Sequence, residues 1–254
     1  MSYDGVATAA AVSELQQNLT LGKIEKIYQP HSEQLIFNIH TKAGRKKLLL
    51  SVSGNHAGAY LTETVPENPA SPPVFCMVMR KHLNAGRITQ IQQHENDRII
   101  EILLETVNEM GFSVNKKLII EIMGKHSNII FCNSDGKIID SIKHISSMMS
   151  SLREVLPGRD YCIPATQDDR LNPLEVTEEA FLDMAMKKPV SIAKALYSSF
   201  TGLSPLLASE ICHRSSIDGD MPVDSLDDDG KKHLFNNLTW IADDVKNHTY
   251  RPNI

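Results

Sequence analysis

Hydrophobic and polar positions divide the chain into a front part with strand-like runs and a back part with helical spacing. The first segment is helical, because apolar residues recur every three or four positions from Val6 to Leu19. Asp4 stands just before this run as a candidate N-cap, and Gly22 follows it as a terminator. The pattern therefore predicts that a helix opens the chain.

Beyond Gly22, short runs rich in Val, Ile and Leu alternate with turn-forming residues, which is typical of β-strands. Four prolines between Pro66 and Pro73 predict an extended loop, and Phe75–Leu83 predicts a short helix. Asn133–Gly136 is a strong hairpin turn. The predicted strands are 23–29, 34–41, 46–52, 88–93, 98–104, 118–123, 128–132 and 137–141.

The pattern changes after Pro164. The polar and acidic stretch Ala165–Pro173 predicts a linker, and Thr177 then begins a helix in capping style. Helical spacing continues through 180–187, 191–200, 205–213 and 231–246. We therefore expect one domain over 1–165 and a helical domain over 166–254.

The turn Thr201–Ser204, with Pro205 after it, joins two of these helices. In a helix–hairpin–helix, such a turn offers backbone amides to a phosphate. An ordinary helical hairpin is the alternative, and the acidity of this part of the chain favours it.

Composition bounds the class of protein. With 254 residues, 41% of them hydrophobic and 22% charged, the chain has the composition of a soluble globular protein. It has no long apolar run and no secretory signal at its start, so we expect a cytoplasmic protein that does not enter a membrane. The cysteines are too widely spaced for a zinc site, and we expect reduced, buried thiols at Cys76, Cys132, Cys162 and Cys212.

Charge is unevenly placed along the chain. The formal net charge of −5 argues at first against a nucleic-acid partner. Residues 1–165, however, carry a net charge of +1, whereas residues 166–254 carry −6. A near-neutral front domain can still bind RNA through a local patch of positive charge. The negative net charge of the whole chain therefore does not exclude an RNA partner.

The polar turn between the strands around Glu121 and Ile130 is the densest candidate site. Gly124 permits close backbone approach to a ligand, and lysine, hydroxyl and amide groups suit phosphate oxygens. A surface hairpin with polar decoration is the alternative. The candidate nucleic-acid-binding residues in this turn are Glu121, Gly124, Lys125, His126, Ser127 and Asn128.

Two further polar groups are candidates for nucleic-acid contact. Arg80, Lys81 and His82 follow one another on the predicted helix after the proline loop, although a solvated face is the more common role of such a run. Asp97 and Arg98 lie in a tight reversal between two strands, where arginine suits bidentate phosphate contact. The sequence contains no catalytic motif, so we expect no catalytic residues, no metal site and no cofactor.

Several segments together resemble the NFACT family, which in bacteria is the FbpA/RqcH group, often called fibronectin-binding proteins. The resemblance covers residues 1 to about 164 in register, and the helical part fits the family less distinctively. The segments that carry it are Asp4-Gly5 with the helix that follows, Gly22–Pro30, Pro73–Leu83, Glu121–Ile130 and Leu156–Tyr161.

The resemblance implies an α+β fold. A β-sandwich-like domain similar to formamidopyrimidine-DNA glycosylases would precede an all-α helix–hairpin–helix domain, and the chain would stop before the family's coiled coil. Those glycosylases use an N-terminal proline followed by glutamate, where this chain has Ser2 and Tyr3. The resemblance therefore implies that this is not an enzyme of that class.

The resemblance also implies a role in ribosome-associated quality control. Family members bind a large ribosomal subunit that carries peptidyl-tRNA, and they recruit alanyl-tRNA for C-terminal alanine tailing of the stalled chain. The positions that match the family's tRNA-handling residues are Asp4, Asp97 and Arg98. A second signature matches Glu121, Gly124, Lys125, His126 and Asn128.

Two other functions remain open at this point. One is a surface adhesin that binds fibronectin, which would require non-classical export because no signal is visible. The other is a DNA-processing enzyme, which fold similarity alone supports only weakly.

Overall fold

The computed structural model describes residues 3–164 and 169–250, which form two units. Among the described residues, the sheet unit consists of 11–94 and 98–164, and the helical unit consists of 3–10, 95–97 and 169–250. The main division of the chain between the two units lies near residue 165. Two short segments from the front of the sequence nevertheless belong to the helical unit.

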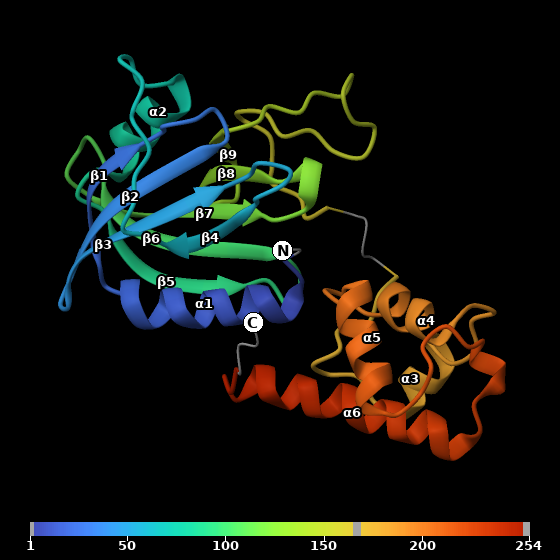
Figure 1. Ribbon diagram of the computed structural model, residues 1–254. Coiled ribbons are helices and arrows are strands. Elements are labelled where there is room, and N and C mark those ends of the chain that lie inside the picture. The colour runs from blue at the N-terminus through green and yellow to red at the C-terminus, as the bar shows by residue number, and fades with distance from the viewer. Residues whose placement is uncertain (1–2, 165–168, 251–254) are drawn as a thin grey trace. The chain divides into compact units, whose positions relative to one another are not determined.

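The sheet unit is built on nine antiparallel strands in the order β4-β3-β2-β1-β5-β6-β7-β8-β9 (Figure 1). β1 and β5 pair only through Lys23 and Arg87. This single pair divides the sheet into two halves, one formed by β1 to β4 and the other by β5 to β9. The strands are β1 (Lys23–Tyr28), β2 (Gln34–Thr41), β3 (Gly44–Ser51), β4 (Gly58–Leu61), β5 (Arg87–Gln93), β6 (Ile99–Val107), β7 (Ser113–Glu121), β8 (Asn128–Asn133) and β9 (Ile138–Ser141).

The two halves of the ladder face each other, as the sandwich-like prediction required. In Figure 1, β1 to β4 lie in front of β5 to β7. Apolar side chains from both halves meet around one small gap, and each of these side chains is at most 2% exposed. This burial of apolar surface between the halves is the main stabilising term of the unit. The residues at the gap are Ile24, Phe37, Ile39, Leu48, Ile88, Ile102, Leu104 and Leu118.

Two helices accompany the sheet. α1 (Gly5–Leu19) has Leu15 and Leu19 fully buried, and its Gln16 Nε2 donates to the Ile91 carbonyl of β5 at 2.6 Å. α2 (Val74–Leu83) buries one face, formed by Phe75, Cys76, Met79 and Leu83. Both helices thus match their predicted positions, because apolar spacing of three and four residues creates a single buried stripe.

The helical unit has its own core. α3 (Glu178–Met184), α4 (Ile192–Ser199), α5 (Pro205–Arg214) and α6 (Asp228–Lys246) surround it, with a short 3₁₀ turn, η3 (Val223–Ser225), before α6. Phe181 and Phe200 are fully buried and stack with their ring centroids 6.0 Å apart. Val6, from the opening segment of the chain, packs against the same core. None of the helices in the described parts of the chain is long and apolar enough to cross a membrane.

Three sequence expectations need correction. β4 was not predicted, because its four residues show no alternation of polar and apolar positions. The predicted linker over 165–173 is wrong at its end, since Leu171 pairs with Phe200 inside the helical unit; residues 165–168 lie outside the described ranges. All four thiols are free as expected, but Cys162 is exposed rather than buried.

Candidate nucleic-acid interface

A polar junction surrounds the turn Thr201–Ser204, which joins α4 to α5 in the helical unit. Asp4 directs both carboxylate oxygens into this junction. Its Oδ1 accepts from the backbone N–H of Ala7 at 2.9 Å, and its Oδ2 accepts from the Ser204 hydroxyl at 2.9 Å. The same hydroxyl accepts from the N–H of Leu207 at 3.1 Å. One carboxylate thus stabilises the N-termini of both α1 and α5.

This arrangement bears on phosphate binding at the α4–α5 turn. A helix N-terminus attracts anions, but the Asp4 carboxylate already supplies negative charge at the start of α5. A phosphate placed beside Ser204 would meet like charge. The geometry therefore favours the structural interpretation of this turn, as an ordinary helical hairpin closed by a carboxylate.

Asn96 connects the reversal between β5 and β6 to the same junction. Its side-chain Nδ2 donates to the Thr201 carbonyl at 3.0 Å, and Asn96 is 1% exposed. Its backbone carbonyl lies where a Cβ on either Gly5 or Gly202 would be, at 2.2 and 1.9 Å respectively. The N–H of Gly5 also donates to the Gly202 carbonyl at 2.7 Å. Two glycines are therefore required for three distant segments to meet here.

The neighbouring residues Asp97 and Arg98 differ in exposure. Asp97 is 2% exposed and belongs to the helical unit, whereas Arg98 is half-buried and belongs to the sheet unit. The Arg98 carbonyl accepts from the N–H of Ile122 at 2.8 Å. Because Asp97 has almost no accessible surface, we expect it to position the turn, and only Arg98 has a side chain that solvent or RNA reaches.

The polar turn after β7, which carries the second family signature, has an exposed tip and a buried base. Gly124, Lys125 and His126 form a 3₁₀ turn, η1, and are exposed, so they could contact a ligand. Ser127 is fully buried, and its hydroxyl accepts from the N–H of Met123 at 2.8 Å.

Asn128, at the base of the same turn, is 1% exposed and joins two segments of the sheet unit. Its Nδ2 donates to the Lys143 carbonyl at 2.9 Å, and its Oδ1 accepts from the N–H groups of Ile129 and Lys143. Ser127 and Asn128 thus use their polar atoms to shape the turn, rather than to present those atoms to phosphate.

Glu121 lies at the end of β7 and is fully buried. The Arg153 guanidinium forms a bidentate pair with its carboxylate, through Nη1 at 2.8 Å to Oε1 and through a short contact from Nη2 to Oε2. The Tyr161 hydroxyl donates to Oε1 at 2.9 Å, and Arg153 Nη1 also donates to the Cys162 carbonyl at 2.6 Å. Glu121 therefore holds the segment around Tyr161 against the sheet, and its carboxylate does not face solvent.

The buried cluster predicts a pH dependence. Burial raises the pKa of Tyr161 well above its usual value of 10.0, and the Glu121 carboxylate raises this pKa further. The folded chain then keeps a proton that the unfolded chain loses above about pH 10, so stability is complete below that pH and falls as pH rises. We expect Tyr161→Phe to reduce this alkaline loss of unfolding free energy, measured by urea titration from about pH 8 to 11.

The matched control is Tyr60→Phe, because Tyr60 is 41% exposed on β4. This variant should keep the alkaline slope of the parent chain. An identical slope in the parent and in Tyr161→Phe would contradict the prediction.

The three cationic candidates on α2 do not form one solvent-facing set. Arg80 donates from Nε to the Ile27 carbonyl at 2.8 Å, and its guanidinium lies 5.6 Å from the centre of the Tyr28 ring. Lys81 is exposed and pairs with Glu109 at 3.2 Å. Burial lowers the pKa of His82, and nearby Lys116 and Lys81 lower this pKa further. At neutral pH, this histidine is therefore mainly uncharged.

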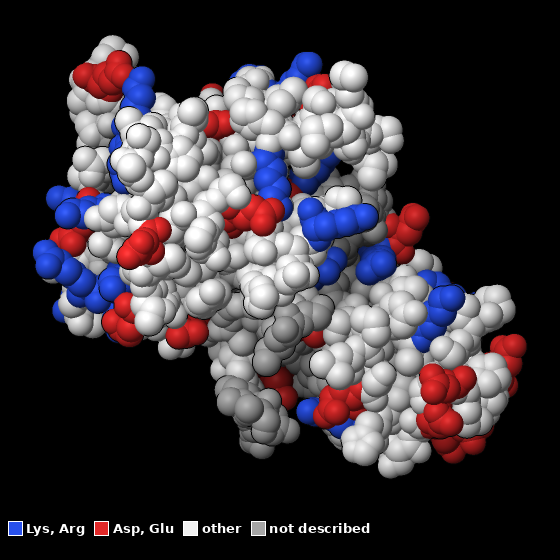
Figure 2. All heavy atoms as spheres, turned by 45° about the horizontal axis from the view of Figure 1, so that its top comes forward, with Lys and Arg blue, Asp and Glu red and all other residues white. Residues whose placement is uncertain are grey.

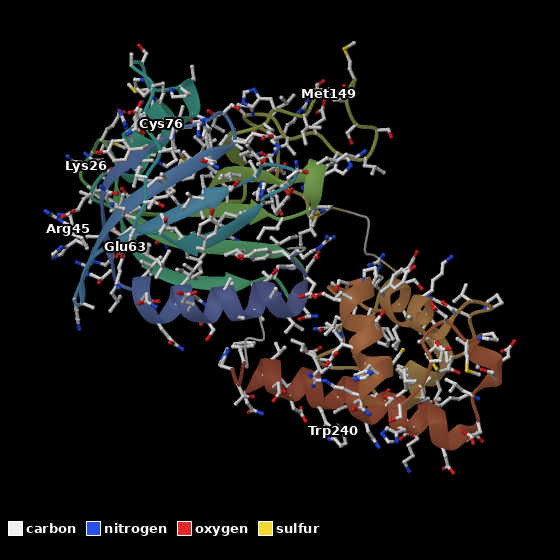
Figure 3. The ribbon with its side chains drawn as sticks, in the orientation of Figure 1. Lys26, Arg45, Glu63, Cys76, Met149 and Trp240 are labelled. Carbon is white, nitrogen blue, oxygen red and sulfur yellow. The ribbon has the colours of Figure 1, made fainter. Side chains whose placement is uncertain are left out.

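Surface charge differs between the units. On the face drawn in Figure 2, Asp and Glu side chains gather over the helical unit, as its sequence charge predicts. Lys26 and Arg45 extend outward from the strands of the sheet unit (Figure 3). In the parts of the chain that the structure describes, no group of three His, Cys, Asp or Glu residues could hold a metal ion.

Sequence reasoning missed two of the residues that define this geometry. Arg153 and Tyr161, the partners of Glu121, were not singled out, although a glutamate inside an apolar strand requires a buried partner. Gly202 was noted only as part of a turn, and its close approach to Asn96 depends on a contact that local patterns do not encode.

Ser2, on which the argument against glycosylase chemistry rests, lies outside the described residues.

Known proteins resemble this chain over its whole length. The family described as NFACT N-terminal and middle domains matches residues 4–254. The Bacillus subtilis (strain 168) protein named Rqc2 homolog RqcH is 38% identical over 255 residues, which cover 100% of this chain and 43% of that protein. The chain thus spans less than half of that relative's length.

Solved structures agree with this relationship. The N-terminal domain of the fibronectin-binding protein PavA from Streptococcus pneumoniae is 40% identical, with a TM-score of 0.75 over 83% of this chain and 78% of that one. The N-terminal part of the fibronectin/fibrinogen-binding protein from Streptococcus suis is 35% identical, with a TM-score of 0.78 over 92% and 85%. From the family match and these identities, we conclude that the chain belongs to the NFACT family and contains its N-terminal and middle domains.

Proposed function

We propose that this chain is the part of a ribosome-associated quality control factor that binds tRNA and the large ribosomal subunit. In the longer protein, it would recruit alanyl-tRNA for C-terminal alanine tailing of stalled nascent chains, in the cytoplasm and on ribosomes. The relationship to the Bacillus subtilis Rqc2 homolog RqcH supports this role.

The observation that carries the proposal is the convergence of the expected tRNA-handling residues. Asp4 and Asp97 are far apart in the sequence, yet both belong to the helical unit. Asp4 hydrogen-bonds Ser204, and Asn96, next to Asp97, hydrogen-bonds Thr201. A set of residues held this closely around one turn has the pre-organisation that recognition of folded RNA by shape requires.

The side chains of these residues differ in exposure, and this difference indicates different roles. Asp4, Asn96 and Asp97 position the chain, whereas Arg98 supplies positive charge to the phosphate backbone. The exposed Lys125 and His126 are a second group that RNA could contact. Because few cations take part, we expect modest affinity and a shallow salt dependence.

The test is charge reversal at Arg98 in the full-length protein. Arg98→Glu should reduce co-purifying tRNA by at least about tenfold, since it replaces a phosphate contact by repulsion and removes roughly 1.4 kcal/mol or more. The measurement is pull-down from cells followed by sequencing of the bound RNA. Bound alanine tRNA together with large-subunit RNA is the result expected for the parent protein.

The matched control is Lys42→Glu, which changes the net charge equally at an exposed position in the turn between β2 and β3. It should retain tRNA. The double variant Asp97→Ala with Arg98→Ala should lose tRNA while remaining folded by circular dichroism. Normal tRNA recovery with a folded Arg98→Glu protein would refute the proposed site.

A fibronectin-binding adhesin is the second candidate, favoured by the names of the similar solved proteins from streptococci. Fractionation of intact cells distinguishes the two functions, because an adhesin is recovered at the surface without lysis markers. We propose that the chain lacks glycosylase activity, since Ser2 and Tyr3 stand where the resembling glycosylases have proline and glutamate.

A further inference from the structure

A pocket of about 230 Å³ lies between β1 and the C-terminal end of α2, within the sheet unit. It exists because β1 pairs with β5 only at Lys23, so that α2, and no strand of the described chain, packs along the remainder of this edge. Both elements supply side chains to the pocket. The lining residues are Glu25, Lys26, Ile27, Tyr28, Arg80 and Asn84.

The Arg80 guanidinium is held in place at this pocket. Its Nε donates to the Ile27 carbonyl at 2.8 Å, and its central carbon lies 5.6 Å from the centre of the Tyr28 ring. Among the residues that the structure describes, no carboxylate forms an ion pair with Arg80. A guanidinium stays charged at all physiological pH values, and its planar fork suits an oxyanion. Arg80 therefore offers the pocket an oriented positive charge that the fold does not neutralise.

Lys26 and Asn84 add two further donors. Both side chains line the pocket and both residues are exposed, Lys26 from β1 and Asn84 directly after α2. In the described parts of the chain, Lys26 also forms no ion pair with a carboxylate. An ammonium and an amide N–H can each donate to an oxygen of an anion. The pocket thus combines two positive charges with three donor side chains.

Glu25, the carboxylate that lines the pocket, is already paired. Its Oε2 accepts from Arg45 Nε at 3.0 Å, and its Oε1 lies 3.9 Å from His40 Nδ1. β1, β2 and β3 together hold five lysines and arginines against this single carboxylate. The neighbouring strands therefore offset the charge of Glu25, and the surroundings of the pocket remain positive.

The C-terminal end of α2 lies beside the pocket, and the carbonyls of its last turn carry the negative end of the helix dipole. The chain's own N–H groups occupy two of these carbonyls. Asn84 donates to the Arg80 carbonyl at 3.2 Å. Gly86 donates to the Leu83 carbonyl at 3.0 Å. The charges of Arg80 and Lys81 in the same turn also oppose the dipole, so the helix end does not exclude an anion.

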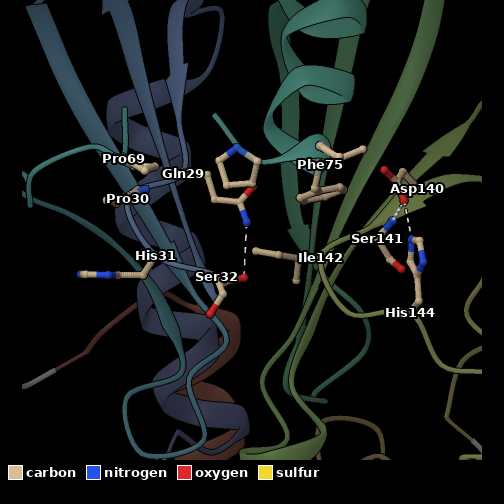
Figure 4. A pocket seen from close by; sticks show the side chains of 12 residues that line it. Gln29, Pro30, His31, Ser32, Pro69, Phe75, Asp140, Ser141, Ile142 and His144 are labelled. Atoms are coloured by element: carbon tan, nitrogen blue, oxygen red, sulfur yellow. Dashed lines mark hydrogen bonds and ion pairs between the residues drawn. The ribbon is translucent and has the colours of Figure 1, made fainter. Parts of the chain in front are cut away.

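A second hollow, about 600 Å³ in volume, lies beside the opposite end of α2 (Figure 4). Asp140 lines it and pairs with His144 at 2.7 Å, and no lysine or arginine of the described chain joins its lining. The two hollows therefore differ in charge, and we expect only the smaller one to attract a phosphate.

We propose that the pocket between β1 and α2 binds a phosphoryl group. Arg80 would hold two of its oxygens through the guanidinium fork, and Lys26 would pair with the same group. A tetrahedral phosphoryl group offers oxygens in more directions than a planar carboxylate does, so it suits three donors better. A small phosphate compound and an RNA backbone share this chemistry. Asp4, Asp97 and Arg98 do not line the pocket, so the site does not depend on the tRNA contacts proposed above.

The test is titration of the ¹⁵N-labelled chain, followed by NMR at constant ionic strength, with inorganic phosphate, acetate and a short oligouridylate. We expect amide shift changes at residues 25–28 and 80–84, and none at 140–144 beside the larger hollow. Phosphate should bind at least about tenfold more tightly than acetate, because it offers more oxygens to the three donors. This comparison uses the parent chain, so it does not depend on any variant folding.

Variants then locate the contact. Lys26→Gln should weaken phosphate binding about tenfold, since it removes a charge-assisted hydrogen bond. Arg80→Lys keeps the charge but not the planar fork, and it should weaken binding as well. The control is Lys232→Gln, which makes the same change at an exposed position of α6 and should bind normally. Amide shifts away from the pocket report whether each variant remains folded.

The oligouridylate distinguishes the two sources of the phosphoryl group. If RNA supplies it, the slope of log affinity against log salt concentration should decrease by about 1 in Lys26→Gln. Binding of inorganic phosphate alone would instead assign the pocket to a small phosphate compound, and either result supports the site. Equal affinity for phosphate and acetate, unchanged affinity in Lys26→Gln, or no shift changes at the pocket with either phosphate probe would overturn the proposal. Arg98→Glu should leave phosphate binding here unchanged, which separates this site from the proposed tRNA contact.

Discussion

Replacing Gly202 by alanine is expected to lower the free energy of unfolding of the helical unit by about 3–5 kcal/mol. Gly202 has φ of +72°, a backbone conformation that costs an alanine about 1–2 kcal/mol. The added Cβ would also lie 1.9 Å from the Asn96 carbonyl oxygen. Because this oxygen belongs to the backbone, the β5–β6 reversal must move before the methyl group can fit. Urea unfolding, followed by circular dichroism, measures the loss.

Gly136→Ala is the matched control for this prediction. Gly136 has a similar φ of +80°, but a Cβ there meets nothing within 4 Å. Alanine at this position should lower the free energy of unfolding only by the conformational cost of the positive φ, about 1–2 kcal/mol. The difference between the two variants isolates the close approach of Asn96 and Gly202. Equal losses in the two variants would mean that the junction is less tightly packed than the structure indicates.

Replacing Glu121 by alanine is expected to lower the unfolding free energy of the sheet unit by about 3–5 kcal/mol. The substitution leaves the Arg153 guanidinium, which is only 15% exposed, without its carboxylate partner. It also removes the acceptor of the Tyr161 hydroxyl. Removing one partner of a buried ion pair lowers the free energy of unfolding by more than the intact pair contributes to it, because the remaining charge stays buried away from water. Denaturant unfolding measures this loss.

The control is Glu154→Ala, which removes a second glutamate–arginine pair from the same unit. Glu154 pairs with Arg159 at 2.9 Å, and the Arg159 side chain is 62% exposed. Its loss should cost at most about 1 kcal/mol, since solvent screens exposed pairs. Glu121→Ala could weaken RNA binding either because the sheet unit unfolds or because a direct contact to RNA is lost. The stability measurement distinguishes these two causes. A Glu121→Ala variant as stable as the parent would contradict the structural role.

Most elements of the fold follow from local patterns. The opening helix and its Asp4 cap, the proline loop, the short helix before Leu83 and eight of the nine strands match the hydrophobic spacing of the sequence. β4 is the exception, because Gly58–Leu61 becomes a strand only by pairing with β3. Such a short segment has too little pattern of its own to be predicted.

The candidate site was predictable only in part. The resemblance located Asp4, Asp97 and Arg98, but not the burial that makes Asp97 a positioning residue. The composition of the turn after β7 indicated a polar site, yet Ser127 and Asn128 use their polar atoms within the fold. Residue type shows which contacts a side chain can make, whereas burial and neighbouring donors decide which contacts it makes.

The sequence by itself determined the order and limits of most helices and strands, because hydrophobic spacing and caps act over a few neighbouring residues. It also determined the family, through motifs whose residues remain in register. Only the tertiary structure decided that Asp4, Asn96 and Gly202 meet in one unit, and that Glu121 finds Arg153. Those outcomes depend on packing between residues far apart in the chain, and no local pattern specifies such distances.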